Sequence, residues 1–424
     1  MSSFVDKMSM VGGKIGSQRH LSAIKDGFIS LMPLIMAGSA ALIVKNLPIP
    51  GWLDILPDFI INLCNFVWWG TFGFLALFAV FSIAYHLAQT YKGDAFRTGF
   101  VALASYLAII PQTAQIGNDT VWGFISWSLT STNSLFVAII IPLIAGELFI
   151  RFNRNKRLLI TLPDSVPPAV GKSFSVLIPA GLTIGIISLL GVFVEQITGS
   201  SIFDFLNKVF LPLVKASDSL WSGIIIVFLN QIFWMLGLHG PSIVGGILEP
   251  ISLNLMTDNM LAFASGIQPP HIMTKPFLDT FVHLGGSGAT LGLLIAIFMT
   301  ARSKLFRTLG KACIVPGAFE INEPVIFGVP IVLNPIFAIP FVFGPILLTI
   351  ISYLATDLGL VSRTVAIIPW ATPPFLSGIL STGGDWRACI LQGINIVIMI
   401  VIYMPFVRIA DKMEIEKENA EVVQ

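Results

Sequence analysis

The chain alternates long apolar stretches with short segments that hold its charged and helix-breaking residues. The hydrocarbon core of a bilayer is about 30 Å thick, so a helix needs roughly 20 mostly apolar residues to cross it. The pattern therefore predicts membrane-spanning helices wherever an apolar stretch approaches that length. These stretches are 27–44, 66–90, 98–112, 133–150, 174–195, 219–238, 281–300, 336–354 and 388–407.

The composition agrees with this pattern. Of the 424 residues, 55% are hydrophobic and 11% are charged, and the formal net charge is +1. Soluble domains carry about 25% charged residues, which argues against an ordinary cytosolic enzyme. The balanced charge and the apolar content exclude a disordered chain and a basic nucleic-acid binder. We therefore predict an all-α polytopic membrane protein.

The cations set the expected orientation. Most Lys and Arg residues lie in the short segments 7–25, 92–97, 151–172, 302–311 and 408–417. The positive-inside rule makes these segments, and so both termini, cytoplasmic. Residues 1–26 have apolar positions at helical spacing among lysines, which predicts a helix at the membrane surface. Residues 200–216 predict a second amphipathic interfacial segment.

Two stretches of the later half do not fit ordinary spans. Residues 239–280 and 312–335 are apolar, yet they contain Pro, Gly and ionisable residues. Irregular backbone at membrane depth is tolerated where it is buried in protein or lines an aqueous cavity. Broken apolar segments of this kind point to a transporter binding site. We predict two re-entrant hairpins here, with the binding site between them.

The first polar cluster runs from Gly317 to Pro324 and holds Glu320, Asn322 and Glu323. A carboxylate can accept hydrogen bonds from sugar hydroxyls, and an amide can donate and accept. Pro324 disfavours a helical conformation at the preceding residue. We interpret Glu323, Asn322 and Glu320 as substrate-binding residues. The carboxylates could instead cap helix ends, pair with a lysine or couple transport to protons.

The second cluster runs from Trp234 to Pro241 and includes His239 between helix-breaking residues. A neutral imidazole donates through one nitrogen and accepts through the other, as a sugar hydroxyl pair requires. Trp234 and Trp370 could each offer a flat apolar face to a pyranose ring. For both tryptophans an interfacial anchor is the alternative. A structural role is the alternative for His239.

Other features carry less chemistry. The cysteines Cys64, Cys313 and Cys389 have no metal-ligand spacing, so we predict no metal site and no cofactor. The small-residue run 285–290 lacks the lysine of a phosphate-binding loop. We assign its glycines to close helix packing, with hairpin flexibility as the alternative. His271 is expected to stabilise a loop.

These motifs resemble a known family. The sequence from Glu320 to Pro324, followed by Phe327-Gly328 and Asn334-Pro335, is similar to the signature of enzyme IIC proteins of the bacterial phosphoenolpyruvate-dependent phosphotransferase system (PTS). Further motifs resemble the lactose/cellobiose/diacetylchitobiose branch. They lie at 14–20, 23–28, 162–174 and 283–288.

The resemblance implies a homodimer of subunits with about ten transmembrane helices, two re-entrant hairpins and amphipathic interfacial helices. It implies a transmembrane half at 27–216 that forms the scaffold and dimer contact, a sugar-carrying half at 217–407 that moves like an elevator, and a cytoplasmic tail at 408–424. Glu323, His239 and Trp234 would correspond to the family's sugar-binding glutamate, histidine and stacking tryptophan. Asn322 lies beside Glu323 in the same motif, and Trp370 is carried over less securely.

The implied function is that of a permease in the bacterial cell membrane for a β-linked disaccharide, with cellobiose first and diacetylchitobiose or lactose next. A separate enzyme IIB, phosphorylated on cysteine and supplied by enzyme IIA, would phosphorylate the sugar's 6-hydroxyl, with Glu323 as a possible base. Two other functions stay open. One is a proton-coupled sugar transporter with Glu320, Glu323 and His239 as a relay. The other is an enzyme acting on a lipid-linked sugar.

Overall fold

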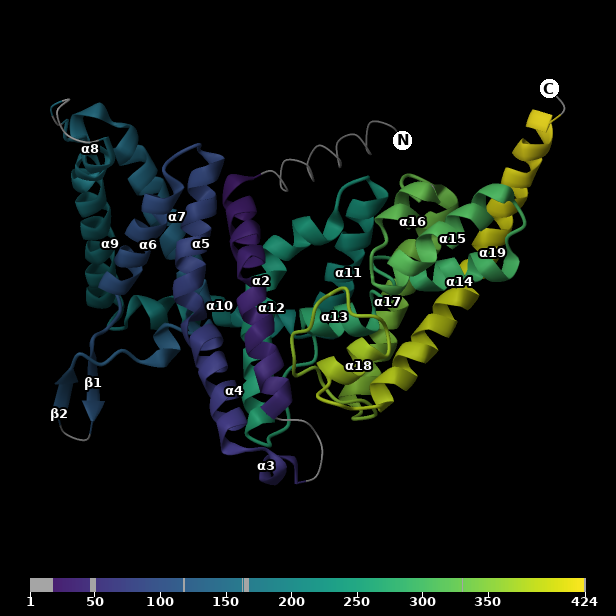
Figure 1. Ribbon diagram of the computed structural model, residues 1–424, viewed down its shortest axis with the longest axis horizontal. Helices are drawn as coiled ribbons and strands as arrows, with labels where there is room; N and C mark the ends of the chain where they lie inside the picture. Colours follow the sequence, from purple (N-terminus) through teal and green to yellow (C-terminus); the bar gives the residue numbers. More distant parts are fainter. Residues whose placement is uncertain are drawn as a thin grey trace. The chain divides into compact units, whose positions relative to one another are not determined.

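The computed structural model describes residues 18–45, 51–116, 119–161, 163, 168–329 and 331–422. The expected surface helix at 1–26 lies mostly outside these residues. The described chain is mainly helical and contains a single two-stranded hairpin (Figure 1). The mostly helical architecture predicted from the sequence is thereby confirmed.

The first 200 residues form eight described α-helices and one β-hairpin. The α-helices are α2 (Arg19–Lys45), α3 (Trp52–Ile55), α4 (Asp58–Thr71), α5 (Leu75–Thr90), α6 (Ala95–Ala108), α7 (Leu135–Arg154), α8 (Pro168–Ser175) and α9 (Leu177–Thr198). Short 3-10 turns lie at Phe72–Phe74, Trp127–Leu129, Thr132–Ser134 and Lys156–Leu158. The strands β1 (Thr113–Ile116) and β2 (Asp119–Trp122) pair antiparallel in the connection between α6 and α7.

The later elements carry the polar clusters. They are α10 (Ile202–Ser217), α11 (Leu220–Met235), α12 (Gly240–Ala264), α13 (Lys275–Phe281), α14 (Thr290–Thr300), α15 (Lys304–Ala318), α16 (Glu323–Gly328), α17 (Pro335–Asp357), α18 (Leu376–Ser381) and α19 (Arg387–Val422). Helix α10 covers the stretch predicted to be amphipathic, and it meets α11 at a bend of 81°.

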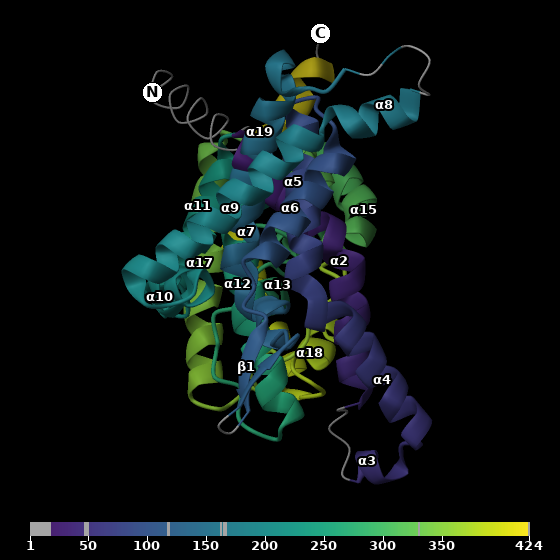
Figure 2. The same ribbon diagram turned by 90° about the vertical axis from the view of Figure 1, so that its left-hand side faces the viewer.

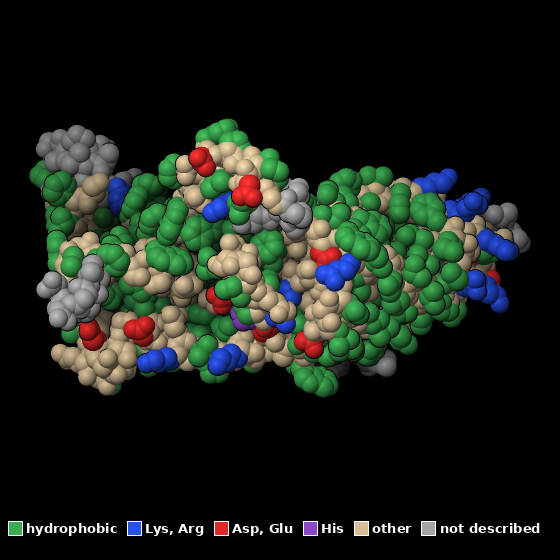
Figure 3. All heavy atoms as spheres, turned by 90° about the horizontal axis from the view of Figure 1, so that it is seen from below, with side chains coloured by type: hydrophobic (Ala, Val, Ile, Leu, Met, Phe, Trp, Pro, Cys, Tyr) green, Lys and Arg blue, Asp and Glu red, His purple; other side chains and the backbone are tan. Residues whose placement is uncertain are grey.

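Among the described residues, six helical stretches are long and apolar enough to cross a membrane, or seven if the bent pair α10–α11 forms one span. Large apolar side chains such as Phe59, Phe66 and Trp221 are exposed on the surface. Hydrophobic side chains also predominate on the face shown in Figure 3. A surface of this kind suits a protein whose solvent is lipid.

The chain divides into two compact units. The first contains residues 18–38 and 66–214 of the described chain, and the second contains residues 39–45, 51–65 and 215–422. In the first unit α5, α6, α7 and α9 lie side by side (Figures 1 and 2). Small residues permit this close approach, since a Cβ on Gly99 would lie 2.7 Å from the Phe81 ring. The second unit holds both polar clusters.

Two sequence predictions about the second unit are wrong. The expected continuous span at 281–300 is interrupted, because α13 ends at Phe281 and α14 begins at Thr290. The backbone between them has positive φ at Gly285, Gly286 and Gly288. These glycines make a turn, and the close packing predicted for them is seen at Gly288, where a Cβ would lie 2.2 Å from the Phe341 ring. The first part of the stretch 239–280, expected to be irregular, is the 25-residue helix α12.

A polar cluster fixes one end of the second unit. His271 Nδ1 lies 2.8 Å from Asp218 Oδ2, and His271 Nε2 lies 3.3 Å from Asp258 Oδ2. Asp218 Oδ1 also accepts hydrogen bonds from the backbone N–H groups of Ile272 and Met273, at 3.0 and 2.8 Å. The loop before α13 is thus tied to the start of α11 and the end of α12, which agrees with the stabilising role expected for His271.

This cluster makes stability depend on pH. Burial by itself lowers the pKa of His271, but hydrogen bonds and charge from Asp218 and Asp258 outweigh burial and raise that pKa to about 9. The pKa of histidine in an unfolded chain is about 6.5. Because the folded value is the higher one, the stabilisation is fully present below pH ~6.5 and is lost as the pH rises through the folded pKa.

We therefore expect the thermal unfolding temperature of the purified protein to fall between pH 6.5 and 9. In the variant His271→Gln most of this fall should be absent, since the glutamine does not titrate. Unfolding curves recorded across this pH range test the prediction. An equal fall in both proteins would contradict it.

Candidate functional site

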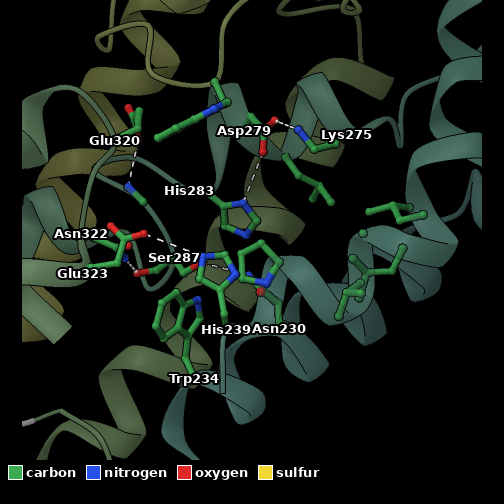
Figure 4. A pocket seen from close by; sticks show the side chains of 18 residues that line it. Asn230, Trp234, His239, Lys275, Asp279, His283, Ser287, Glu320, Asn322 and Glu323 are labelled. Atoms are coloured by element: carbon green, nitrogen blue, oxygen red, sulfur yellow. Dashed lines mark hydrogen bonds and ion pairs between the residues drawn. The ribbon is translucent and has the colours of Figure 1, made fainter. Parts of the chain in front are cut away.

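A cavity of about 360 Å³ opens in the second unit (Figure 4). Its volume lies within the range of roughly 300–1,000 Å³ typical of small-molecule sites. The wall combines apolar side chains with convergent polar ones. Lining residues come from α11, α12, α13 and α16, the turns before α14 and α16, and the connection before α18, and include all six residues predicted to bind substrate: Trp234, His239, Glu320, Asn322, Glu323 and Trp370.

His239 and Glu323 lie next to each other in the wall of this cavity (Figure 4). His239 is the residue before α12, and its Nδ1 accepts hydrogen bonds from Ser242 N at 3.2 Å and from the Ser242 hydroxyl at 2.7 Å. A nitrogen that accepts a backbone N–H bond carries no proton, so in the neutral ring Nε2 carries it. His239 Nε2 lies 3.8 Å from Glu323 Oε1, and each side chain is about half exposed.

Glu323 owes its position to a helix start. It is the first residue of α16, and Pro324 occupies the first turn, where a missing N–H costs nothing. The preceding residue, Asn322, is 4% exposed, and its Nδ2 donates to the backbone carbonyl of Ser287 at 2.6 Å. The predicted break at Pro324 is therefore the junction between a tight turn and α16.

The two tryptophans differ in their exposure. Trp234 is 3% exposed, and its ring centroid lies 4.7 Å from that of His239 at an interplanar angle of 55°. Trp370 is 53% exposed. Both tryptophans line the cavity, and Trp234 packs against the imidazole of His239.

Glu320 contacts the protein backbone. Its Oε2 accepts hydrogen bonds from Gly285 N at 2.6 Å and from Gly286 N at 2.8 Å. The residue is 8% exposed and has a positive φ of 66°. Glu320 lies in the cavity wall, and within the described part of the chain it neither caps a helix nor pairs with a lysine.

Sequence reasoning missed a charged row on another wall of the cavity. Lys275 Nζ lies 2.8 Å from Asp279 Oδ2, and Asp279 Oδ1 lies 3.7 Å from His283 Nδ1 (Figure 4). The three residues recur every fourth position, so α13 and its end present them on one face. That spacing within an apolar segment was the signal that could have identified them.

Several buried polar atoms at the cavity lack a partner among the described residues. They are Asn230 Oδ1, Trp234 Nε1 and His283 Nε2. Buried polar atoms are normally hydrogen-bonded, and the exceptions concentrate where a ligand or water completes the bonding. The arrangement can therefore receive a small molecule that is rich in hydroxyl groups.

Comparison with known proteins identifies the chain's relatives. The profile of the family described as "Phosphotransferase system, EIIC" matches residues 25–345. The chain belongs to the EIIC family of the phosphotransferase system. The resemblance found in the sequence is thereby confirmed, and the EIIC chain is a membrane permease component.

Individual relatives align over nearly the whole EIIC chain. A lichenan permease IIC component from Bacillus subtilis is 38% identical, over 99% of this chain and 95% of the relative. A cellobiose-specific EIIC component from Geobacillus stearothermophilus is also 38% identical, over 98% of this chain and 95% of the relative. The crystal structure of the transporter ChbC, the IIC component of the N,N'-diacetylchitobiose-specific system, has a TM-score of 0.94 and 39% identity, covering 98% and 99% of the two chains.

The geometry around His239 predicts the effect of a small substitution. A Cβ on Gly240 would lie 2.2 Å from the backbone oxygen of Asn230, so the start of α12 would have to move. Overpacking of this kind costs about 1–3 kcal/mol. We expect Gly240→Ala to lower the thermal unfolding temperature of the EIIC chain by several degrees.

Gly245→Ala is the matched control, because Gly245 lies in the same helix and a Cβ there would meet nothing within 4 Å. That variant should unfold at or slightly above the wild-type temperature, since alanine favours helix more than glycine does. Equal unfolding temperatures for both variants would contradict the contact between Gly240 and Asn230.

Proposed function

We propose that this EIIC protein binds a β-linked disaccharide in the cavity and carries it across the membrane for phosphorylation. Cellobiose is the first choice of substrate, and diacetylchitobiose and lactose follow. The observation that carries the proposal is the pairing of His239, which precedes α12, with Glu323, the first residue of α16.

The distance between this pair suits a bridging hydroxyl group. At 3.8 Å, His239 Nε2 and Glu323 Oε1 are too far apart for a strong direct hydrogen bond. A sugar hydroxyl entering beside them can donate its proton to the carboxylate and accept the proton of Nε2–H. Hydrogen bonds to a charged group contribute about 1.5–3 kcal/mol each. The pair therefore selects a ligand with an exposed hydroxyl.

The rest of the cavity suits a sugar ring. Trp370 offers an exposed aromatic face for the C–H side of a pyranose, and Leu248 and Leu278 add apolar wall. Asn322, Lys275 and Asp279 supply further donors and acceptors. Relatives named for lichenan, cellobiose and diacetylchitobiose support a β-linked substrate.

The proposal extends to the complete transport cycle. The bound sugar's 6-hydroxyl lies against Glu323, which can accept its proton. The 6-oxygen then bonds to the phosphoryl phosphorus of a cysteine-phosphorylated enzyme IIB as the P–S bond breaks and the cysteine leaves as a thiolate, which enzyme IIA phosphorylates again. Both are separate chains in this proposal. Phosphorylation makes inward release effectively irreversible.

The wider architecture is part of the same proposal. The EIIC subunit would form a homodimer through the half at 27–216, and the half at 217–407 would move the sugar in an elevator-like step. We retain about ten spans, re-entrant hairpins in the later half and cytoplasmic termini as predictions.

One observation favours a second candidate function. The row Lys275, Asp279 and His283 places titratable groups along the cavity wall. Ionisable residues at membrane depth often form proton relays. A proton-coupled sugar transporter would use them together with Glu323.

Ligand binding tests the first proposal. Cellobiose, diacetylchitobiose and lactose should each be titrated against the detergent-purified protein, with the rise in thermal unfolding temperature as the readout. We expect cellobiose to give the largest rise, and His239→Ala or Glu323→Gln to weaken its binding by about tenfold or more, because each loses a hydrogen bond to the sugar. Glu195→Gln, a carboxylate change on α9 in the first unit, is the control. Normal binding by both site variants would contradict the proposal.

Uptake into proteoliposomes separates the two functions. Accumulation that requires phosphoenolpyruvate and the soluble PTS proteins supports group translocation. Accumulation driven by a proton gradient alone supports the second candidate. If Glu323→Gln retains the full phosphorylation rate at saturating sugar, Glu323 binds the sugar without acting as a base.

A further inference from the structure

The tight turn between α13 and α14 forms part of the cavity wall. We call residues 283–289 the glycine turn. Positive φ values of 83°, 92° and 83° at Gly285, Gly286 and Gly288 make it a backbone that few other residues adopt. A Cβ on Gly285 would lie 2.2 Å from Leu291 N, and a Cβ on Gly288 would lie 2.2 Å from the Phe341 ring. The contacts with Leu291 and Phe341 therefore leave no room for a side chain at Gly285 or Gly288.

Its strongest support comes from a second turn far along the chain. We call residues 319–322 the Glu320 turn. One oxygen of Glu320 accepts both the Gly285 and the Gly286 N–H groups, at 2.6 and 2.8 Å. Two successive backbone N–H groups thus converge on one side-chain oxygen, and this shared acceptor joins the two turns.

A second contact joins the same two turns. Asn322 Nδ2 donates to the Ser287 carbonyl at 2.6 Å, and a Cβ on Gly286 would lie 2.5 Å from Asn322 Cγ. Asn322 and Ser287 are both buried. The two turns are therefore packed without space for water or a ligand between them at this point.

The joined turns contribute several groups to the cavity. The glycine turn supplies His283 and Ser287, and the Glu320 turn leads directly into Glu323. The distance between these groups is set by the contact between the turns. Oε2 of Glu320 already accepts two backbone N–H groups, and the residue is only 8% exposed. Both observations argue against the direct sugar contact expected from the sequence.

We propose that Glu320 is a positioning residue, which holds the glycine turn against the Glu320 turn and so sets the spacing between Glu323 and the His283–Ser287 wall. This inference rests on the proposed function for its effect on sugar binding. The contact between the turns can be tested without a sugar.

Two substitutions at Glu320 separate positioning from direct binding. In Glu320→Gln the side-chain carbonyl can take the place of Oε2 and accept the same two N–H groups, whereas Glu320→Ala removes the acceptor. Positioning predicts that the dissociation constant for cellobiose rises at least tenfold in Glu320→Ala and stays within threefold of wild type in Glu320→Gln. Hydrogen exchange of peptides that cover 283–289, measured without sugar, should speed up in the alanine variant only.

A third substitution disturbs the contact between the two turns at the glycine turn. Gly286→Ala keeps the carboxylate but forces the turns apart, so its dissociation constant for cellobiose should also rise at least tenfold. Gly359→Ala is the matched control, since Gly359 has a similar φ of 71° and a Cβ there would meet nothing within 4 Å. If Glu320→Ala does not fold, Glu320→Gln and Gly286→Ala still decide the question.

The outcomes are distinct. Equal loss of binding in Glu320→Gln and Glu320→Ala, with exchange unchanged, would make Glu320 a direct sugar ligand and overturn the inference. Normal binding in Glu320→Ala or in Gly286→Ala would also overturn it. If the wild-type protein binds no cellobiose, the proposed substrate is wrong, and the exchange of residues 283–289 alone then tests whether Glu320 holds the turn.

Discussion

Backbone polar groups that leave a helix inside an apolar protein must find partners within the protein, and this constraint shapes the cavity. Helices α13 and α14 are separated by a turn at 282–289 in which several backbone N–H and C=O groups are bonded to side chains from elsewhere in the chain. Glu320 accepts two of the N–H groups, Asn322 donates to the Ser287 carbonyl, and the Tyr403 hydroxyl donates to the Gly288 carbonyl at 2.7 Å. Polar side chains at the cavity therefore hold the backbone of its wall in place, and some of them also line the cavity.

His239 illustrates how one side chain serves both purposes. Its Nδ1 satisfies an N–H at the start of α12, which orients the ring and leaves the proton on Nε2. The same ring packs on buried Trp234 and directs Nε2 toward Glu323. Helix capping thus fixes the tautomer that the proposed sugar contact requires.

Much of this arrangement could be predicted from the sequence, because its signals are local. Polar residues beside prolines in apolar stretches stand out, and the six residues chosen on that basis line one cavity. Their binding of sugar stays a prediction. The rest depends on contacts between distant segments. Residues 285–289 are all small, and their sequence alone does not show that Glu320, 35 positions after Gly285, accepts the N–H groups of Gly285 and Gly286. In the sequence, Lys275 and Asp279 have the spacing of an ordinary helical ion pair. Only the structure shows that both residues line the cavity.

The central claim is that one hydroxyl group of a bound disaccharide bridges His239 and Glu323. An experimentally determined structure of the protein with bound cellobiose tests it most directly. We expect one hydroxyl of the sugar within about 2.6–3.2 Å of both His239 Nε2 and a Glu323 oxygen, with a ring against Trp370. Cellobiose bound outside this cavity, or inside it with the pair contacting only each other, would contradict the claim.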